Sequence, residues 1–170
     1  MKNILVLLAA TIFLIACKEP RELSSTDPIN WEKRSVKTVM PDSLEIGKTF
    51  LSIYSQIYIR NDAEKSNLTA TVSLHNPNLE DAIYISKAVY YDTHGDPIRT
   101  YFDKAIFIKP METVQIVIDG VDQEGGTGAN FVFDWQTNID SNEPIFEAVM
   151  ISTYGQQGIS FVTSGKRIKA

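Results

Sequence analysis

The chain has 170 residues, of which 44% are hydrophobic and 22% charged, so it fits one globular domain rather than a disordered segment. Sixteen Lys and Arg stand against 21 Asp and Glu, and this acidic balance argues against nucleic acid as a partner. One cysteine permits neither an internal disulfide nor a cysteine zinc cage, and two histidines leave little room for a His-rich metal centre.

The first segment is typical of a secretory signal. Lys2 is followed by an apolar run at residues 4–15, which is too short to cross a bilayer as a helix of about 20 residues. Residues 14–17, Leu-Ile-Ala-Cys, resemble the bacterial lipobox, whose cysteine receives a diacylglyceryl group and becomes the mature N-terminus. We expect a lipoprotein signal peptide over residues 1–16 and lipid attachment at Cys17. An ordinary signal peptide is the alternative.

Residues 17–44 are predicted to be the lipidated N-terminus and a flexible tether, because Pro20, Pro28 and Pro41 interrupt any periodicity. Trp31 could dock on the domain or lie at the membrane interface, and we favour docking. In enterobacteria, the absence of Asp after the lipidated cysteine favours the outer membrane. The expected location is therefore the bacterial cell envelope, lipid-anchored at the outer membrane.

The remainder, residues 45–170, has a hydrophobic period of two. Residues 68–75 alternate strictly, which places Leu68 and every second residue on a core face and His75 on the solvent side. About eight short strands separated by turn residues predict an all-β fold, a single antiparallel β-sandwich of immunoglobulin-like type. The expected strands cover residues 50–59, 68–75, 83–91, 99–108, 113–118, 131–137, 146–153 and 159–162.

Two local features of this strand pattern are specific. Residues 91–97 are expected to form a hairpin loop in which Gly95 takes positive φ. Phe131, Phe133 and Trp135 share one side of a strand, so we expect them in the core. Tyr84, Tyr90, Tyr101 and Trp135 could instead form a stacking platform, although packing is the favoured interpretation.

Four motifs in the same order resemble a bacterial family of domains of unknown function (DUF3124-like), whose members look like small secreted or lipid-anchored envelope proteins. The resemblance runs from about residue 50 to 168 and leaves out the predicted tether. It implies a fold and a location but no reaction. The motifs are residues 90–95, 125–131, 142–151 and 155–161.

No residues form a recognisable catalytic or phosphate-binding motif. His75 and His94 are expected to be solvated surface side chains, and no Gly-x-Ser-x-Gly elbow is present. A glycosidase-like pair could be drawn from Asp134, Glu143 and Glu147, but acids on the solvent face of strands are ordinary. We predict no catalytic residues and no cofactor.

A weak calcium candidate remains. Asp119, Asp122 and Glu124 place three hard oxygen ligands within six residues, on a loop that glycine could fold around an ion. The spacing fits no EF-hand, and a solvated acidic loop is the favoured interpretation.

Two Gly- and amide-rich loops are the candidate partner-binding surface. They carry Gly125, Gly126 and Asn130 in one loop and Gln156 and Gln157 in the other. Each precedes a strand, and glycine exposes backbone groups to a partner. The alternative is that the glycines serve positive φ and the amides satisfy neighbouring backbone groups.

The predicted function is a non-enzymatic envelope lipoprotein that binds or scaffolds an envelope protein or a glycan. The alternative is an envelope enzyme that acts on glycans or peptides through surface carboxylates. An enzyme should gather acids in one cleft, whereas a binding module should present an exposed groove or sheet edge.

Overall fold

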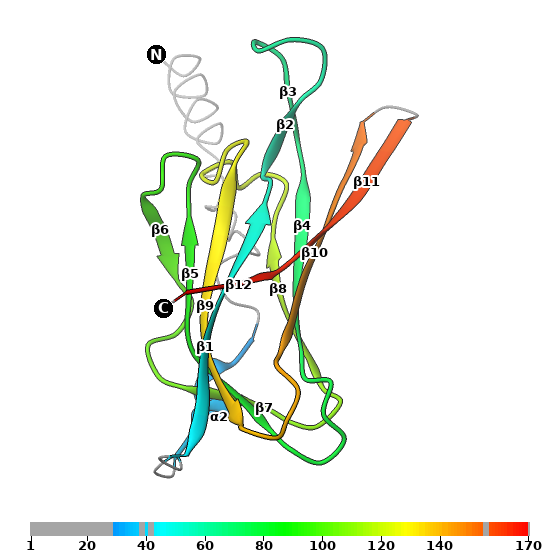
Figure 1. Cartoon of the computed structure of the whole chain (residues 1–170). Coiled ribbons are helices and arrows are strands. Elements are labelled where there is room, and N and C mark those ends of the chain that lie inside the picture. Colours follow the sequence, from blue (N-terminus) through cyan, green and yellow to red (C-terminus); the bar gives the residue numbers. More distant parts are fainter. Residues whose placement is uncertain (1–28, 38–39, 41–42, 155–156, 170) are drawn as a thin grey trace, which may run out of the picture.

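The computed structural model describes residues 29–37, 40, 43–154 and 157–169, with the side chains of Tyr154 and Gln157 left out (Figure 1). The predicted signal peptide and Cys17 lie outside these residues. Within the described part of the chain, no helix has both the length and the apolar character needed to span a bilayer.

The described residues form one short helix and twelve strands. They are α2 (Trp31–Arg34), β1 (Leu44–Ile53), β2 (Gln56–Tyr58), β3 (Lys65–Asn67), β4 (Thr69–His75), β5 (Ile83–Tyr91), β6 (Pro97–Thr100), β7 (Ile106–Ile108), β8 (Thr113–Ile118), β9 (Ala129–Asn138), β10 (Ile145–Tyr154), β11 (Gln157–Ser164) and β12 (Lys166–Ile168).

Every strand pair in the described residues is antiparallel, which confirms the all-β antiparallel prediction. The first sheet has the order β12-β1-β9-β5-β6, with β7 also paired to β5, and the second has the order β11-β10-β4-β8. A separate small hairpin joins β2 to β3. Twelve strands replace the predicted eight, and an immunoglobulin-like arrangement is not confirmed.

Two predicted strands are each divided in the structure. The strand expected at residues 50–59 breaks at Ser55, which is buried and donates its backbone N–H to Gly126 O. The strand expected at 99–108 becomes β6 and β7, because Tyr101 and Phe102 between them are buried in the core. β3 and β12 escaped prediction because their few residues are mostly polar or charged and lack an apolar alternation.

The core lies between the two sheets and follows the predicted faces. Leu68 and the apolar residues of β4 have no exposed surface, while His75 and the alternate polar positions are half-buried. Phe131, Phe133 and Trp135 are fully buried, so the packing interpretation is confirmed for them. Gly95 has φ +89°, as its predicted hairpin loop requires.

Residues 29–37, which precede β1, are docked on the domain rather than extended as a tether. Trp31 is 7% exposed, and its ring lies 5.0 Å from that of Phe102, which confirms docking. Ser35 forms a β-bridge with Ile106 of β7. The predicted tether boundary at residue 44 is therefore wrong, because the large apolar surface of Trp31 gains more from burial than from exposure.

An ion pair holds this docked segment. Arg34 donates to Glu112 at 2.8 Å, and this hydrogen bond lowers the pKa of the Glu112 carboxyl below its ordinary value. A carboxylate with a lowered folded-state pKa contributes stability at neutral pH, and that stability is lost as pH falls through the folded-state pKa. Docking of the segment should therefore weaken in acid.

We predict that the tryptophan emission of the full chain shifts to the red as pH falls below about 4, because Trp31 leaves the core. Glu112→Gln should already show part of the shift at neutral pH and little further change in that window. Trp31→Phe retains only Trp135, whose emission should stay constant. An equal acid shift in Trp31→Phe would mean that the whole domain unfolds, and would contradict the prediction.

Candidate functional site

The Gly-rich loop before β9 is tied down by its own backbone. The Thr93 hydroxyl donates to Gly125 O at 2.9 Å, and the Thr93 hydroxyl oxygen accepts from the Gly128 N–H at 3.0 Å. Gly126 O accepts from the backbone N–H of Ser55 at 3.1 Å. These backbone N–H and C=O groups were expected to be exposed to a partner, but they form hydrogen bonds within the domain.

The local structure requires glycine at two of these positions. A Cβ on Gly125 would overlap the Tyr90 hydroxyl, and Gly126 has φ +69°, a conformation that side chains disfavour. Asn130 is a half-buried residue of β9, paired with Ser52 and Tyr91 in the neighbouring strands. The structural interpretation of this loop is therefore supported.

Arg99 of β6 organises the acidic part of the loop. Its guanidinium contacts a carboxylate oxygen of Asp122 and one of Glu124, each at 3.1 Å. Asp122 is only 1% exposed, while the Asp119 carboxylate accepts from the Val121 N–H at 3.0 Å. A cationic side chain thus occupies the place between two of the three proposed calcium ligands.

The described residues contain no group of three or more His, Cys, Asp or Glu side chains that could hold a metal ion. The calcium hypothesis finds no support in this geometry, because Arg99 already supplies the positive charge that the buried Asp122 needs.

Below the loop lies a second buried polar contact. The Tyr90 and Ser55 hydroxyls are 2.7 Å apart, and neither side chain is exposed. Burial raises the pKa of the Tyr90 phenol well above its ordinary range, so the hydroxyl stays protonated and acts in hydrogen bonding. Sequence reasoning missed this contact and the role of Arg99, since their partners are distant in the chain.

The Gly-rich loop and the end of the paired strands β10 and β11 lie at the same end of the sandwich. At this end β1 finishes at Ile53 opposite Ala129, the first residue of β9, and Ile151 of β10 lies opposite Thr69, the first residue of β4. Figure 1 shows the β2–β3 and β10–β11 hairpins projecting there, at the top of the view. We call this the hairpin end.

The β2–β3 hairpin stands between the Gly-rich loop and β10. Gln56 N–H donates to Gly126 O at 3.0 Å on one side, and the Ser66 hydroxyl is 3.1 Å from that of Ser152 on the other. Gln156 and the side chain of Gln157 lie outside the described residues, so the shared amide surface stays a prediction.

The hairpin end exposes large apolar side chains. They belong to both projecting hairpins, and each is close to half exposed or more: Tyr58 53%, Ile59 56%, Ile151 45% and Ile159 46%. The register places Ile151 and Ile159 on opposite faces of the β10–β11 hairpin, so this hairpin exposes apolar side chains on both faces. Exposed apolar surface is a common feature of protein interaction sites.

The other candidate residues are separated. His75 bonds to Thr113 at 2.8 Å with Glu147 at 3.8 Å on the second sheet, while Asp134 pairs with Lys48 at 3.2 Å on the first. His94 is exposed in its hairpin loop. Each of these acids has its own cationic or imidazole neighbour, so the described residues show no shared acid–base centre.

Three of the four aromatic residues considered as a platform are core residues. Tyr90, Tyr101 and Trp135 are buried, and Tyr84 is half-buried on β5. The Trp135 indole N–H donates to the Thr49 hydroxyl at 2.9 Å inside the domain. The packing interpretation therefore holds for the three buried rings.

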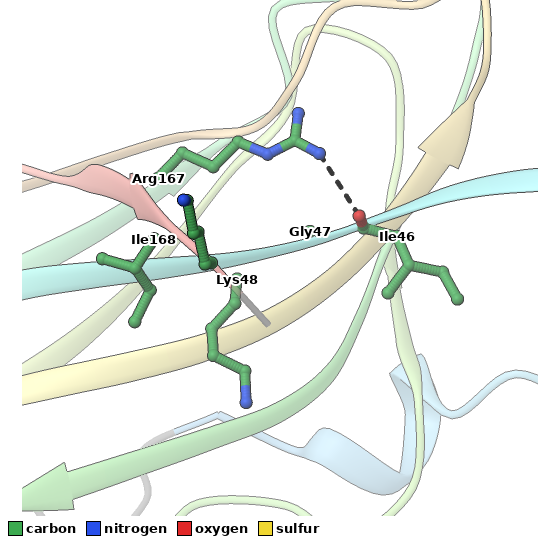
Figure 2. A pocket seen from close by; sticks show the side chains of 6 residues that line it. Ile46, Gly47, Lys48, Arg167 and Ile168 are labelled. Carbon is green, nitrogen blue, oxygen red and sulfur yellow. Dashed lines mark hydrogen bonds between the residues drawn. The ribbon is translucent and has the colours of Figure 1, made fainter.

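An open hollow of about 470 Å³ lies where β12 meets β1 (Figure 2). Arg167 borders it, and its guanidinium lies 5.2 Å from the Trp135 ring and pairs with Glu45 and Glu143. Figure 2 shows the guanidinium bonded to Ile46 O. Arg167 and Lys48, two of the cations that line the hollow, are thus engaged in ion pairs within the domain.

Replacing Arg99 by Met should destabilise the domain by about 3 kcal/mol, because a buried carboxylate at Asp122 loses its ion pair. The matched control is Arg60→Met, whose 3.6 Å pair with Glu64 involves an Arg60 side chain that is 79% exposed. That change should stay within about 0.5 kcal/mol. Urea denaturation of the three proteins measures the difference, and equal effects would contradict the assigned role of Arg99.

Comparison with known proteins gives a family match over most of the domain. Residues 46–168 match the family described as "Protein of unknown function (DUF3124)". No curated protein matches the chain. Among solved structures, the chain is similar to the crystal structure of Thermotoga maritima 1070. The two chains share 11% sequence identity with a TM-score of 0.43, over 71% of this chain and 92% of that chain. The family match covers well over half of the 170 residues, so the chain belongs to the DUF3124 family, as its four motifs predicted.

Proposed function

We propose that the protein is a bacterial envelope lipoprotein, anchored through Cys17, whose β domain is a non-enzymatic binding or scaffolding module. The observation that carries the binding role is the exposed apolar surface of the hairpin end, with Tyr58 and Ile59 on one projecting hairpin and Ile151 and Ile159 on the other. Such side chains are stabilised when a partner covers them.

The arrangement of charged groups supports binding over catalysis. Asp122 and Glu124 share Arg99, Glu143 pairs with Arg167, and Asp134 pairs with Lys48 on the first sheet. A glycosidase needs two acids about 5–10 Å apart across one substrate. These four carboxylates are instead each engaged by a cationic side chain in a structural ion pair.

The place where the N-terminal segment docks gives the domain an orientation. α2 packs beside β7, whose Ile108 lies opposite Ile83, at the end of β5 away from the hairpin end (Figure 1). Thirteen residues separate Cys17 from Trp31 and can span at most about 45 Å. A lipid on Cys17 would therefore hold the α2 side near the bilayer and leave the hairpin end directed toward partners.

The anchor is tested by metabolic labelling with a palmitate analogue in a bacterial host. The wild-type chain should be labelled and fractionate with membranes, because the lipobox cysteine carries the acyl chains. Cys17→Ser should be unlabelled and released in soluble form. Equal labelling of the two proteins would overturn lipid attachment at Cys17.

The binding role is tested with a photo-crosslinking amino acid placed at Tyr58 in intact cells. We expect a discrete adduct with one envelope protein or glycan, because the hairpin end is the surface that a partner covers. The matched control places the same group at Leu79, which is 80% exposed after β4, at the opposite end. The same adduct from both positions, or hydrolysis of a glycan or peptide that one carboxylate substitution abolishes, would refute the proposal.

A further inference from the structure

β11 (Gln157–Ser164) is the last strand of the second sheet and pairs on one side only. Its partner is β10, with Val149 opposite Val162 and Ile151 opposite Ser160. In the sheet order no strand follows β11 on its other side. Figure 1 shows it as the outer strand of the projecting hairpin. The backbone groups along its outer edge are therefore a template for another strand.

This edge lacks the usual protection against strand addition. β11 contains neither a charged residue nor a proline, and none of residues 158–164 is buried. Ile159 is 46% exposed and Val162 is 58% exposed, and they lie on opposite faces of the strand. Natural edge strands are commonly blunted by lysine, proline or inward charge.

Two other end strands of this domain carry that protection. β12 has Lys166 and Arg167 among its three residues, and β6 begins with Pro97 and contains Arg99. β8, at the other end of the second sheet, also lacks charge and proline, but its Val114, Ile116 and Ile118 are buried. What distinguishes β11 is that it exposes large apolar side chains on both of its faces.

We propose that β11 pairs in antiparallel fashion with β11 of a second copy of this chain, about a two-fold axis at Ser160. The second sheets of the two copies would then form one continuous sheet. In this register Ile159 lies opposite Phe161 of the copy, and an aromatic and a β-branched side chain make a favourable cross-strand pair.

The absence of charge permits a second copy as the occupant. In an antiparallel pair about a two-fold axis, the residue on the axis lies beside its own counterpart and its neighbours lie opposite nearby residues of the same strand, so charges of one sign near the axis would face like charges and be destabilised. β11 has no charged residue in its eight positions, and the uncharged Ser160 lies on the axis. The edge of β11 can therefore pair with a second copy of itself. The edge of β12 could not, because its adjacent Lys166 and Arg167 would face the same cations of the copy.

The inner face of β11 is already shaped by the domain. Phe161 makes an edge-on contact with Tyr54 at 5.8 Å, and the Thr163 hydroxyl donates to Ser52 O at 2.7 Å. These contacts fix the C-terminal half of the strand against β1 and hold the edge extended for a partner.

This pairing goes beyond the proposed function and does not depend on it. Ile159 belongs to both surfaces, but neither the lipid at Cys17 nor the cross-linking position Tyr58 takes part in the β11 edge. The photo-crosslinking result at the hairpin end and the oligomeric state of the purified chain are separate readouts, so either proposal can fail alone.

The register is tested by disulfide formation. Cys17 is the only cysteine, so the full chain with Cys17→Ser offers a cysteine-free background in a mild detergent. Adding Ser160→Cys should give a disulfide-linked dimer under mild oxidation, since the two positions meet on the axis. Adding Ser164→Cys on the same face should not, because the two copies of that residue would be about 26 Å apart. Equal cross-linking of both variants would overturn the register.

The interface is tested independently by sedimentation velocity. The wild-type chain should sediment as a dimer, and Ser160→Lys should become monomeric because two lysines meet on the axis. Ser164→Lys should remain dimeric, and circular dichroism should be the same for all three proteins. A wild-type chain that is monomeric at every concentration, or a Ser160→Lys chain that stays dimeric, would overturn pairing through β11.

Discussion

Stacked aromatic rings at the centre of the sandwich join the two sheets, and the hairpin end is built on them. Phe133 of β9 stacks on Phe146 of β10 with ring centroids 4.3 Å apart, which links the first sheet to the second. Phe131 continues the stack at 5.3 Å, and Tyr90 of β5 follows at 4.9 Å. Aromatic side chains bury more apolar area than other residues and add favourable ring–ring contacts. The stack ends at the Tyr90 hydroxyl, whose bond to Ser55 places the turn between β1 and β2 beneath the Gly-rich loop.

Polar clusters fix the two ends of the domain in different ways. Near the hairpin end, the pair of Arg99 with buried Asp122 and the hydroxyl of Thr93 hold the Gly-rich loop in place. At the opposite end, Asn78 accepts from the Asn142 N–H at 2.7 Å and joins two connections with an amide network. Satisfied buried polar groups specify one local structure, because any alternative leaves a donor or acceptor without a partner. The loops are therefore rigid, and the projecting hairpins carry the exposed apolar surface.

The distribution of exposed surface gives the domain a direction. The docked α2 segment lies beside β7, and the hairpins project from the other end of the domain (Figure 1). The unpaired edge of β11 belongs to one of these projecting hairpins. β12 is the end strand of the first sheet, and its Arg167 pairs with Glu45 and Glu143. A protein built in this way would present one end and one edge to other molecules, while its charged groups stabilise the fold.

Local chemistry determined most of the secondary structure in advance. The strict alternation at residues 68–75 required a half-buried strand, and Gly95 required a turn with positive φ, because neither property depends on distant residues. The tertiary structure alone decided what the polar residues do, since Arg99 meets Asp122 across 23 positions of the chain and Ser55 meets Tyr90 across 35. Such contacts follow from the order of strands in the sheets, which hydrophobic periodicity does not encode. For that reason Gly125, which the sequence suggested as exposed backbone for a partner, proved to leave the space that the Tyr90 hydroxyl needs.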